Sequence, residues 1–292
     1  MKYIVILSLV IVSIVVLLTS LTSAGSNVGF SYNPSKKFHL QVPDIKLSDE
    51  QKESLYQGKP ICRLLPGRSG FKSGRMEVVL PFDPVTTFQI VSDIDHFHLV
   101  DPSYPSSGST FRTRKSFMPY VFDGAHCIEN GHEYLYQLLV MPLVDPRKYS
   151  LTRFHDMTEF PWESAWEASP NLECSGKGNP EMAELAKDAV HITINTGSWR
   201  IGPLSAEMRK TEEDKMRSYV IYFVDTNPGG DLGKLAPIVN EATKTAMPKL
   251  VANIKFHGPS WRAHLKKYHN AQEVAQYDAW LEAYKQSMGV QQ

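Results

Sequence analysis

The sequence contains few cysteines and carries no net charge, and both features limit what the protein can do. Its 292 residues include three cysteines, and none has the paired spacing of a zinc-binding module. Basic and acidic residues number 31 each, so no bulk electrostatic attraction favours nucleic acid as a partner. A glycine-rich phosphate loop and the G-x-S-x-G hydrolase motif are also absent from the sequence. What remains is an ordinary globular composition, 42% hydrophobic and 21% charged.

The redox state of the three cysteines, Cys62, Cys127 and Cys174, is left open by the sequence. In an oxidising compartment two of them would pair and the third would stay free. Alternatively, all three are small buried hydrophobic residues. Their spacing does not decide between these states.

The first 24 residues differ in composition from the rest of the chain. A short basic start at Lys2 precedes an apolar run over residues 4–18, and the small residues Thr22, Ser23 and Ala24 follow. This layout predicts a secretory signal peptide cleaved after Ala24, and therefore an exported protein, secreted or periplasmic. The alternative is an uncleaved membrane anchor, because residues 4–21 are just long enough to cross a bilayer. Polar residues 25–46 are predicted to form a linker.

The rest of the chain shows strand patterns between a few helix signals. Ser48 and Gln51 form a capping box that predicts a short helix over residues 47–57. Asp83 followed by Pro84 predicts the start of a second helix that runs to residue 97. Residues 161–189 are rich in Gly, Pro, Ser and Asn and are predicted to be irregular, with a short helix over 180–189. Strands are predicted at 60–65, 74–80, 111–117, 120–128, 134–140, 148–154, 191–201 and 219–224.

The last strand, 219–224, leads through a Pro-Gly-Gly turn into a long helix over residues 232–256. Pro237 is expected near its first turn and Pro248 inside it. Apolar residues recur at helical spacing along this helix. They include Leu235, Val239, Met247, Leu250, Val251 and Ile254.

This strand–turn–helix ending resembles the C-terminal part of the START (steroidogenic-acute-regulatory-protein-related lipid-transfer) domain. The residues that match its pattern are Tyr222, Val224, Asp225, Gly230, Leu232, Pro237, Ala246 and Pro248, although Pro237 falls several residues late. A second likeness is at Pro146, Arg147 and Tyr149, where Lys148 replaces the acidic residue of the family pattern. Gly197 and Trp199 resemble the family's G-x-W strand. The resemblance covers residues 47–256.

The resemblance implies an α+β helix-grip fold, a curved antiparallel β-sheet wrapped around a long C-terminal helix with an internal apolar cavity. One domain would occupy residues 47–258, followed by a helical tail over 259–292 that packs on the outside of the domain or contacts a membrane or partner. The implied function is to bind a hydrophobic lipid, either a sterol or a phospholipid or acyl lipid, and to carry or sense it outside the cytoplasm or at a membrane. The lipid would enter past the 141–146 loop and the long helix. A monomer without cofactors that contacts membranes transiently is expected.

An enzyme of the same superfamily is the alternative, because cyclases and hydrolases place polar groups in such a cavity and act by acid–base chemistry. No catalytic motif supports it in this sequence, so enzymatic activity is not expected.

Candidate ligand contacts follow from strand 148–154, where Tyr149, Leu151 and Arg153 share one face. A buried Arg153 requires a partner, and Glu133 on the preceding strand is the candidate. Alternatively, Arg153 points to solvent. Trp199 is interpreted as either cavity wall or plain core. The full predicted set is Glu133, Tyr136, Tyr149, Leu151, Arg153, Trp199, Leu235, Val239, Met247, Leu250 and Val251.

The sequence contains one cluster with metal-ligand character, formed by Asp93, Asp95, His96, His98 and Asp101. His-x-His binds a metal when both rings lie on one strand face. Here the cluster closes a predicted helix, where residues two apart diverge. No metal is therefore expected.

Overall fold

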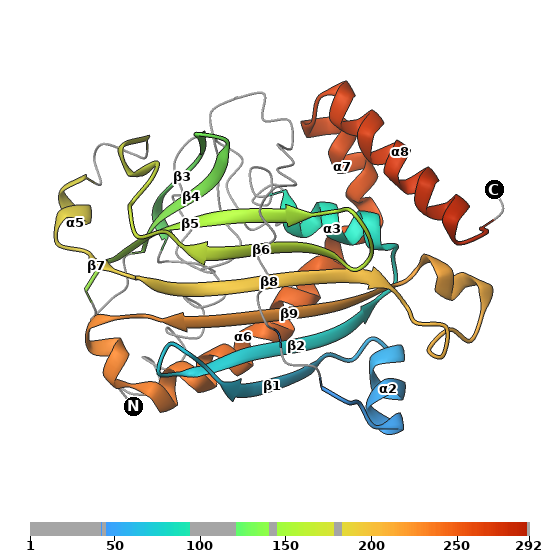
Figure 1. Ribbon diagram of the computed structural model, residues 1–292, viewed down its shortest axis with the longest axis horizontal. Helices are drawn as coiled ribbons and strands as arrows, with labels where there is room; N and C mark the ends of the chain where they lie inside the picture. Colours follow the sequence, from blue (N-terminus) through green and yellow to red (C-terminus); the bar gives the residue numbers. More distant parts are fainter. Residues whose placement is uncertain (1–41, 43–44, 94–120, 140–144, 178–182, 291–292) are drawn as a thin grey trace.

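The computed structural model describes residues 42, 45–93, 121–139, 145–177 and 183–290 of the chain (Figure 1). The predicted signal peptide, the predicted strand at 111–117, most of the 141–146 loop and the Asp95–Asp101 part of the metal-like cluster lie outside these residues. Among the described residues, no helix is long and apolar enough to cross a membrane.

Nine strands form a single sheet in the described part of the chain. In spatial order they are β1 (Ile61–Pro66), β2 (Lys72–Leu80), β9 (Ser218–Asn227), β8 (Ile194–Pro203), β6 (Trp162–Ala168), β5 (Arg147–Asp156), β4 (His132–Leu139) and β3 (Val121–Glu129), while β7 (Val190–His191) pairs in parallel with β5. Every other pairing is antiparallel. The helices are α2 (Asp49–Tyr56), α3 (Pro84–Ser92), α5 (Ala183–Lys187), α6 (Ala236–His257), α7 (Trp261–Tyr268) and α8 (Ala271–Ser287).

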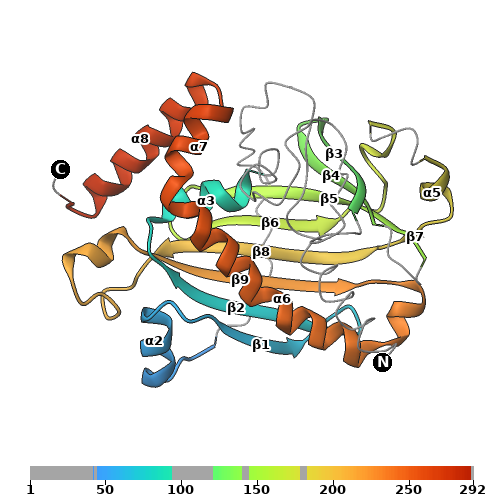
Figure 2. The same ribbon diagram turned by 180° about the vertical axis from the view of Figure 1, so that it is seen from behind.

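The long helix α6 runs across one face of the sheet (Figure 2). A Cβ on Gly74 of β2 would lie 2.7 Å from Cγ2 of Thr243 on α6, so Gly74 permits this close approach. We call the side of the sheet that α6 covers the helix face and the opposite side the outer face. The curved antiparallel sheet and its long C-terminal helix confirm the predicted α+β helix-grip architecture.

Local signals in the sequence explain where several elements begin. The capping box of Ser48 and Gln51 starts α2, and the Asp83 carboxylate caps α3 with Pro84 in its first turn. Pro237 lies in the first turn of α6, where its missing N–H costs nothing. Gly229 and Gly230 both have positive φ, 64° and 53°, as expected for the turn before the helix.

Two boundaries differ from the prediction. Strand β6 lies inside the stretch predicted to be irregular, and it places Trp162 and Trp166 on one face with Glu163 and Glu167 on the other. The helix predicted from residue 232 begins at Ala236, because a 3-10 turn over Gly230–Lys234 precedes it.

The C-terminal helices pack against α3 and the end of the sheet (Figure 1). Tyr277 of α8 hydrogen-bonds Thr86 of α3, with 2.7 Å between their hydroxyl oxygens. The rings of Trp280 and Trp162 meet edge to face at 6.1 Å between centroids. The segment beyond α6 is thus joined to the main core by buried contacts.

Candidate functional site

Arg153 of β5 lies on the helix face of the sheet. Consecutive register pairs run in one line from Glu133 through Arg153, Trp166, Gly197 and Val224 to Gly74, the glycine beneath α6. Directly paired residues point to the same side of a sheet. Arg153 is 8% exposed, so the alternative in which it points to solvent is wrong.

The expected pairing of Arg153 with Glu133 is present. Nη1 of Arg153 donates to Oε1 of Glu133 at 2.6 Å, and Nη2 donates to the backbone oxygen of Ser92 at 3.3 Å. Ser92 ends α3, so the guanidinium also meets the negative end of that helix. A guanidinium has five N–H donors. The described contacts use two of them, which leaves donors for a ligand.

Two histidines also contact Glu133. Nε2 of His126 lies 3.0 Å from Oε1, and Nε2 of His155 lies 3.1 Å from Oε2. Burial alone would raise the pKa of Glu133, but the charge of Arg153 and the hydrogen bonds of both histidines hold it well below the usual value. Burial lowers the pKa of His155, with Glu133 opposing it. The group is therefore an ionised carboxylate with three buried nitrogen donors around it.

Aromatic side chains cover the helix face between Arg153 and β9. Trp166 extends over Gly197, where an added Cβ would lie 2.2 Å from its ring, and its Nε1 donates to Oδ1 of Asn195 at 3.1 Å. Trp199 and Tyr222 meet at 4.4 Å between ring centroids. The Tyr222 hydroxyl is buried without a hydrogen-bond partner among the described residues, and burial raises its pKa well above the usual value.

Most of the other predicted contact residues also lie on this side of the sheet. Tyr149 and Leu151 are buried, and the Tyr149 hydroxyl donates to the side chain of Gln137. The predicted contact residues of α6 that are buried are Val239, Met247, Leu250 and Val251. These positions agree with a contact role, which itself stays a prediction.

Two predicted contact residues are placed elsewhere. Leu235 is 39% exposed, because it lies in the turn before α6 and not on the buried side of the helix. Tyr136 is buried on the outer face, since it pairs with Ser150 and Ala125 while Glu133 pairs with Arg153. There it packs with Cys127 and Cys174, which form a disulfide, while Cys62 is free.

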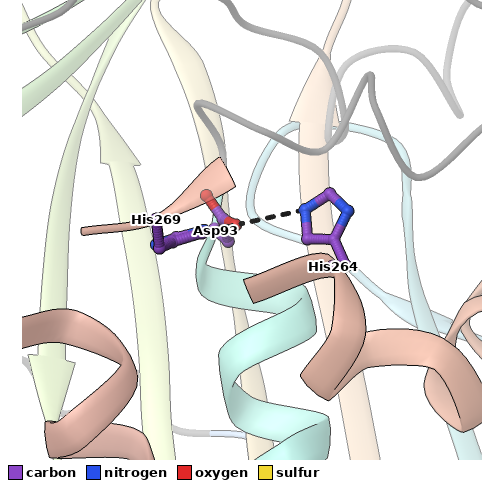
Figure 3. A group of neighbouring side chains, drawn as sticks. All are labelled: Asp93, His264 and His269. Carbon is purple, nitrogen blue, oxygen red and sulfur yellow. Dashed lines mark hydrogen bonds and ion pairs between the residues drawn. The ribbon is translucent and has the colours of Figure 1, made fainter. Parts of the chain in front are cut away.

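A second polar cluster, not predicted from the sequence, lies at the end of α3. Asp93, the residue after α3, meets His264 of α7 and His269, the residue after α7 (Figure 3). Oδ2 of Asp93 lies 2.6 Å from Nε2 of His269 and 4.0 Å from Nε2 of His264. Nδ1 of His269 lies 2.9 Å from Oε2 of Glu273 in α8. Asp93 is part of the metal-like cluster seen in the sequence, whereas His264 and His269 lie in the predicted tail.

Comparison with known proteins gives matches among solved structures. No protein-family model matches the chain, and the search of curated proteins finds no match. Human STARD10 is 13% identical, with 80% of this chain and 86% of that chain covered and a TM-score of 0.46. A STAR-related lipid transfer protein from Xanthomonas axonopodis (fragment 25–204) is 16% identical, with 68% and 93% covered and a TM-score of 0.42.

The Zhui aromatase/cyclase from Streptomyces sp. R1128 is 11% identical, with 68% of this chain and 96% of that chain covered and a TM-score of 0.33. The matches thus include lipid-transfer domains and an enzyme. At these identities and TM-scores they transfer neither a ligand nor an activity. The helix-grip architecture of this chain is established by its own strand order and by helix α6.

Proposed function

We propose that this protein binds a lipid with one polar group between the helix face of the sheet and α6, and that it carries or senses this lipid. Arg153 orients the polar group, and Glu133 holds Arg153 in place. The observation that carries the proposal is a buried guanidinium with unused donors on a face that also carries buried Trp166, Trp199 and Leu151.

The charge arrangement favours a ligand with a hydroxyl, carbonyl or phosphate oxygen. An apolar site needs few polar groups to orient a ligand, and those groups act strongly because water is excluded. The orphaned Tyr222 hydroxyl supports the same assignment, since a buried hydroxyl without a partner is costly and a ligand oxygen would satisfy it. The apolar part of the lipid would gain about 25 cal/mol per Å² removed from water.

The test is to purify the full chain from cells and identify bound lipid by native mass spectrometry and solvent extraction. We expect one lipid per chain in the wild type and little in Arg153→Leu. Arg200→Leu is the matched control, because Arg200 pairs with Glu163 across neighbouring strands on the outer face, 3.0 Å apart. Lipid retained equally by Arg153→Leu, or absent from the wild type, would contradict the proposal.

A second candidate, a cavity enzyme, is favoured by the contact between His155 and Glu133. A buried neutral histidine against a carboxylate is an arrangement that accepts protons in general-base catalysis. This candidate predicts that a bound hydrophobic substrate is recovered chemically altered by the wild type and unaltered by His155→Gln. Recovery of the same intact lipid from both proteins favours the transfer or sensing role.

We also propose that the protein works in an oxidising compartment, either exported or held at a membrane by residues 4–21. The disulfide between Cys127 and Cys174 supports this location, because such bonds persist outside the reducing cytosol. Sequencing of the mature N-terminus tests it: loss of residues 1–24 indicates cleavage, and a retained Met1 in a membrane fraction indicates an anchor. A retained Met1 in the soluble cytosolic fraction would contradict both.

A further inference from the structure

Three potential metal ligands converge from separate elements at the end of α3. Asp93 follows α3, His264 lies in α7, and His269 ends the same helical segment. One donor atom from each lies within 4.8 Å of the others. The side chains are 4%, 10% and 5% exposed, so water is largely excluded from the group.

The separations suit a small divalent ion. Tetrahedral Zn²⁺ with bonds near 2.0–2.1 Å holds its ligand atoms about 3.3 Å apart. Here the Asp93 oxygen lies 2.6 Å from one imidazole nitrogen and 4.0 Å from the other, so the ideal spacing falls between the two. In Figure 3 the Asp93 carboxylate lies between the two rings. The ligand atoms of the two histidines lie within 4.8 Å of each other, so shifts of about 1 Å in the three side chains would bring all the separations to this value.

The neighbouring residues orient these ligands as they do around known metal sites. A metal-bound histidine usually gives its other ring N–H to a carboxylate, which fixes the tautomer. Glu273 is in that position, 2.9 Å from Nδ1 of His269, and it is itself held in the capping box of α8 with Asn270. The His264 ring stacks on Trp261 at 4.6 Å and lies 4.8 Å from the ring of Tyr268.

We propose that Asp93, His264 and His269 bind a divalent transition-metal ion, with Zn²⁺ as the best fit, and that the ion fastens α7 and α8 to the end of α3. Two imidazoles and one carboxylate form a donor set that zinc accepts, while calcium and magnesium prefer oxygen ligands only. A water or another donor completes the tetrahedron. This site is independent of the proposed lipid function, since its residues are distinct from Arg153 and Glu133.

The rival explanation is that the cluster works without metal. His269 would then be a charged imidazolium held between Asp93 and Glu273, while the Nε2 atom of His264 lies 4.0 Å from the Asp93 carboxylate, beyond hydrogen-bond distance. The two explanations differ most clearly at His264. With an ion it is a ligand, whereas without one its replacement leaves the contacts of His269 intact.

The experiment uses the full chain, dialysed against chelator and then titrated with ZnCl₂. Binding is measured by calorimetry and by metal analysis after gel filtration, and melting is compared with and without zinc. Co²⁺ serves as a second probe, because visible absorption reports nitrogen and oxygen coordination. We expect one Zn²⁺ per chain and a higher melting temperature in zinc for the wild type.

His264→Asn should lose this binding and the zinc-dependent rise in melting temperature. Glu273→Gln should bind zinc about ten- to a hundredfold more weakly. His132→Asn is the control, since His132 lies in β4 next to the ring of Tyr134 and is not one of the three proposed ligands, so its replacement should leave zinc binding unchanged. No zinc binding by the wild type, equal binding by His264→Asn and the wild type, or an equal loss in the control would overturn the proposal.

Discussion

Arg153 and Glu133 face one another on β5 and β4, and the same guanidinium reaches the last carbonyl of α3. The pair therefore joins the sheet to a helix as well as offering donors to a ligand. Breaking a buried ion pair leaves one charge without a partner, which costs more than the pair contributes. The same two residues therefore affect both stability and binding, and experiments must separate the two effects.

Arg153→Leu is expected to lower the free energy of unfolding by about 3–5 kcal/mol, because the Glu133 carboxylate, 15% exposed, loses its main counter-charge. Arg200→Leu should cost about 0–1 kcal/mol, since the side chain of Arg200 is a quarter exposed and its pair with Glu163 is screened by water. Urea denaturation measures both. Arg153→Lys keeps the charge and is the variant in which to measure lipid content if the leucine variant is too unstable. Equal destabilisation by the two leucine variants would contradict the assignment of Arg153 to a buried, charge-paired position.

Acid is expected to destabilise the protein through the same cluster. The pKa of Glu133 is below its ordinary value of 4.5 in the folded state, so its contribution is present above that pH and is lost as pH falls toward the folded value. The pKa of His155 is below its ordinary value of 6.5, so folding disfavours its protonation and stability also falls with pH below 6.5. Both effects have the same sign, and His126 and Arg153 face the same carboxylate.

Urea unfolding between about pH 8 and pH 4 should show a loss that begins near the histidine range and steepens in the carboxyl range. His155→Gln should remove the first part of the loss, and Glu133→Gln should reduce the second. A stability that rises on acidification, or a wild-type profile identical to that of both variants, would contradict this reading of the cluster.

Local chemistry accounts for what the sequence predicted well. Helix starts at Ser48 and Asp83 depend on hydrogen bonds within three residues, so they are visible in the sequence. The pairing of Arg153 with Glu133 follows from β4 and β5 being consecutive antiparallel strands and from the alternation of side chains along each of them. Residues of opposite parity cannot share a strand face, so Tyr136 and Glu133 lie on opposite sides.

Tertiary packing accounts for what the sequence did not show. Trp162 to Ala168 alternate as a strand should, but their glycine- and proline-rich surroundings masked the pattern. Asp93 and His269 lie far apart in the chain and meet only because α7 and α8 fold back on α3. Their spacing in sequence carries no information about this contact. The His-x-His pattern at residues 96–98 is typical of metal ligands, but it does not indicate that Asp93 contacts His264 and His269.

The disulfide between Cys127 and Cys174 is expected to stabilise the protein. It closes a loop with a sequence separation of 47, and its Cα atoms are 6.0 Å apart, within the usual range. From the chain entropy of the unfolded state, removing the disulfide should lower the free energy of unfolding by about 4 kcal/mol.

A Cys127→Ser, Cys174→Ser double variant should unfold at lower urea concentration, and reductant should then have no further effect. Cys62→Ser is the control and should behave like the wild type. Thiol titration of the denatured wild type should give one free thiol; three would contradict the bond.

The hydroxyl of Tyr222 gives the sharpest test of a ligand on the helix face. It is 1% exposed and has no hydrogen-bond partner among the described residues, so Tyr222→Phe should leave the lipid-free protein as stable as the wild type or up to about 1–3 kcal/mol more stable. Tyr149→Phe is the matched control, because that hydroxyl donates to Gln137 and its loss should destabilise the protein by about 1 kcal/mol.

If Tyr222 meets a ligand oxygen, Tyr222→Phe should bind lipid roughly tenfold more weakly despite its equal or greater stability, since one hydrogen bond of about 1.4 kcal/mol corresponds to that factor. Chemical denaturation of delipidated protein and calorimetric titration with the co-purified lipid measure the two quantities separately. A variant that is destabilised without ligand and binds lipid normally would show that the hydroxyl has a structural partner, and would remove Tyr222 from the site.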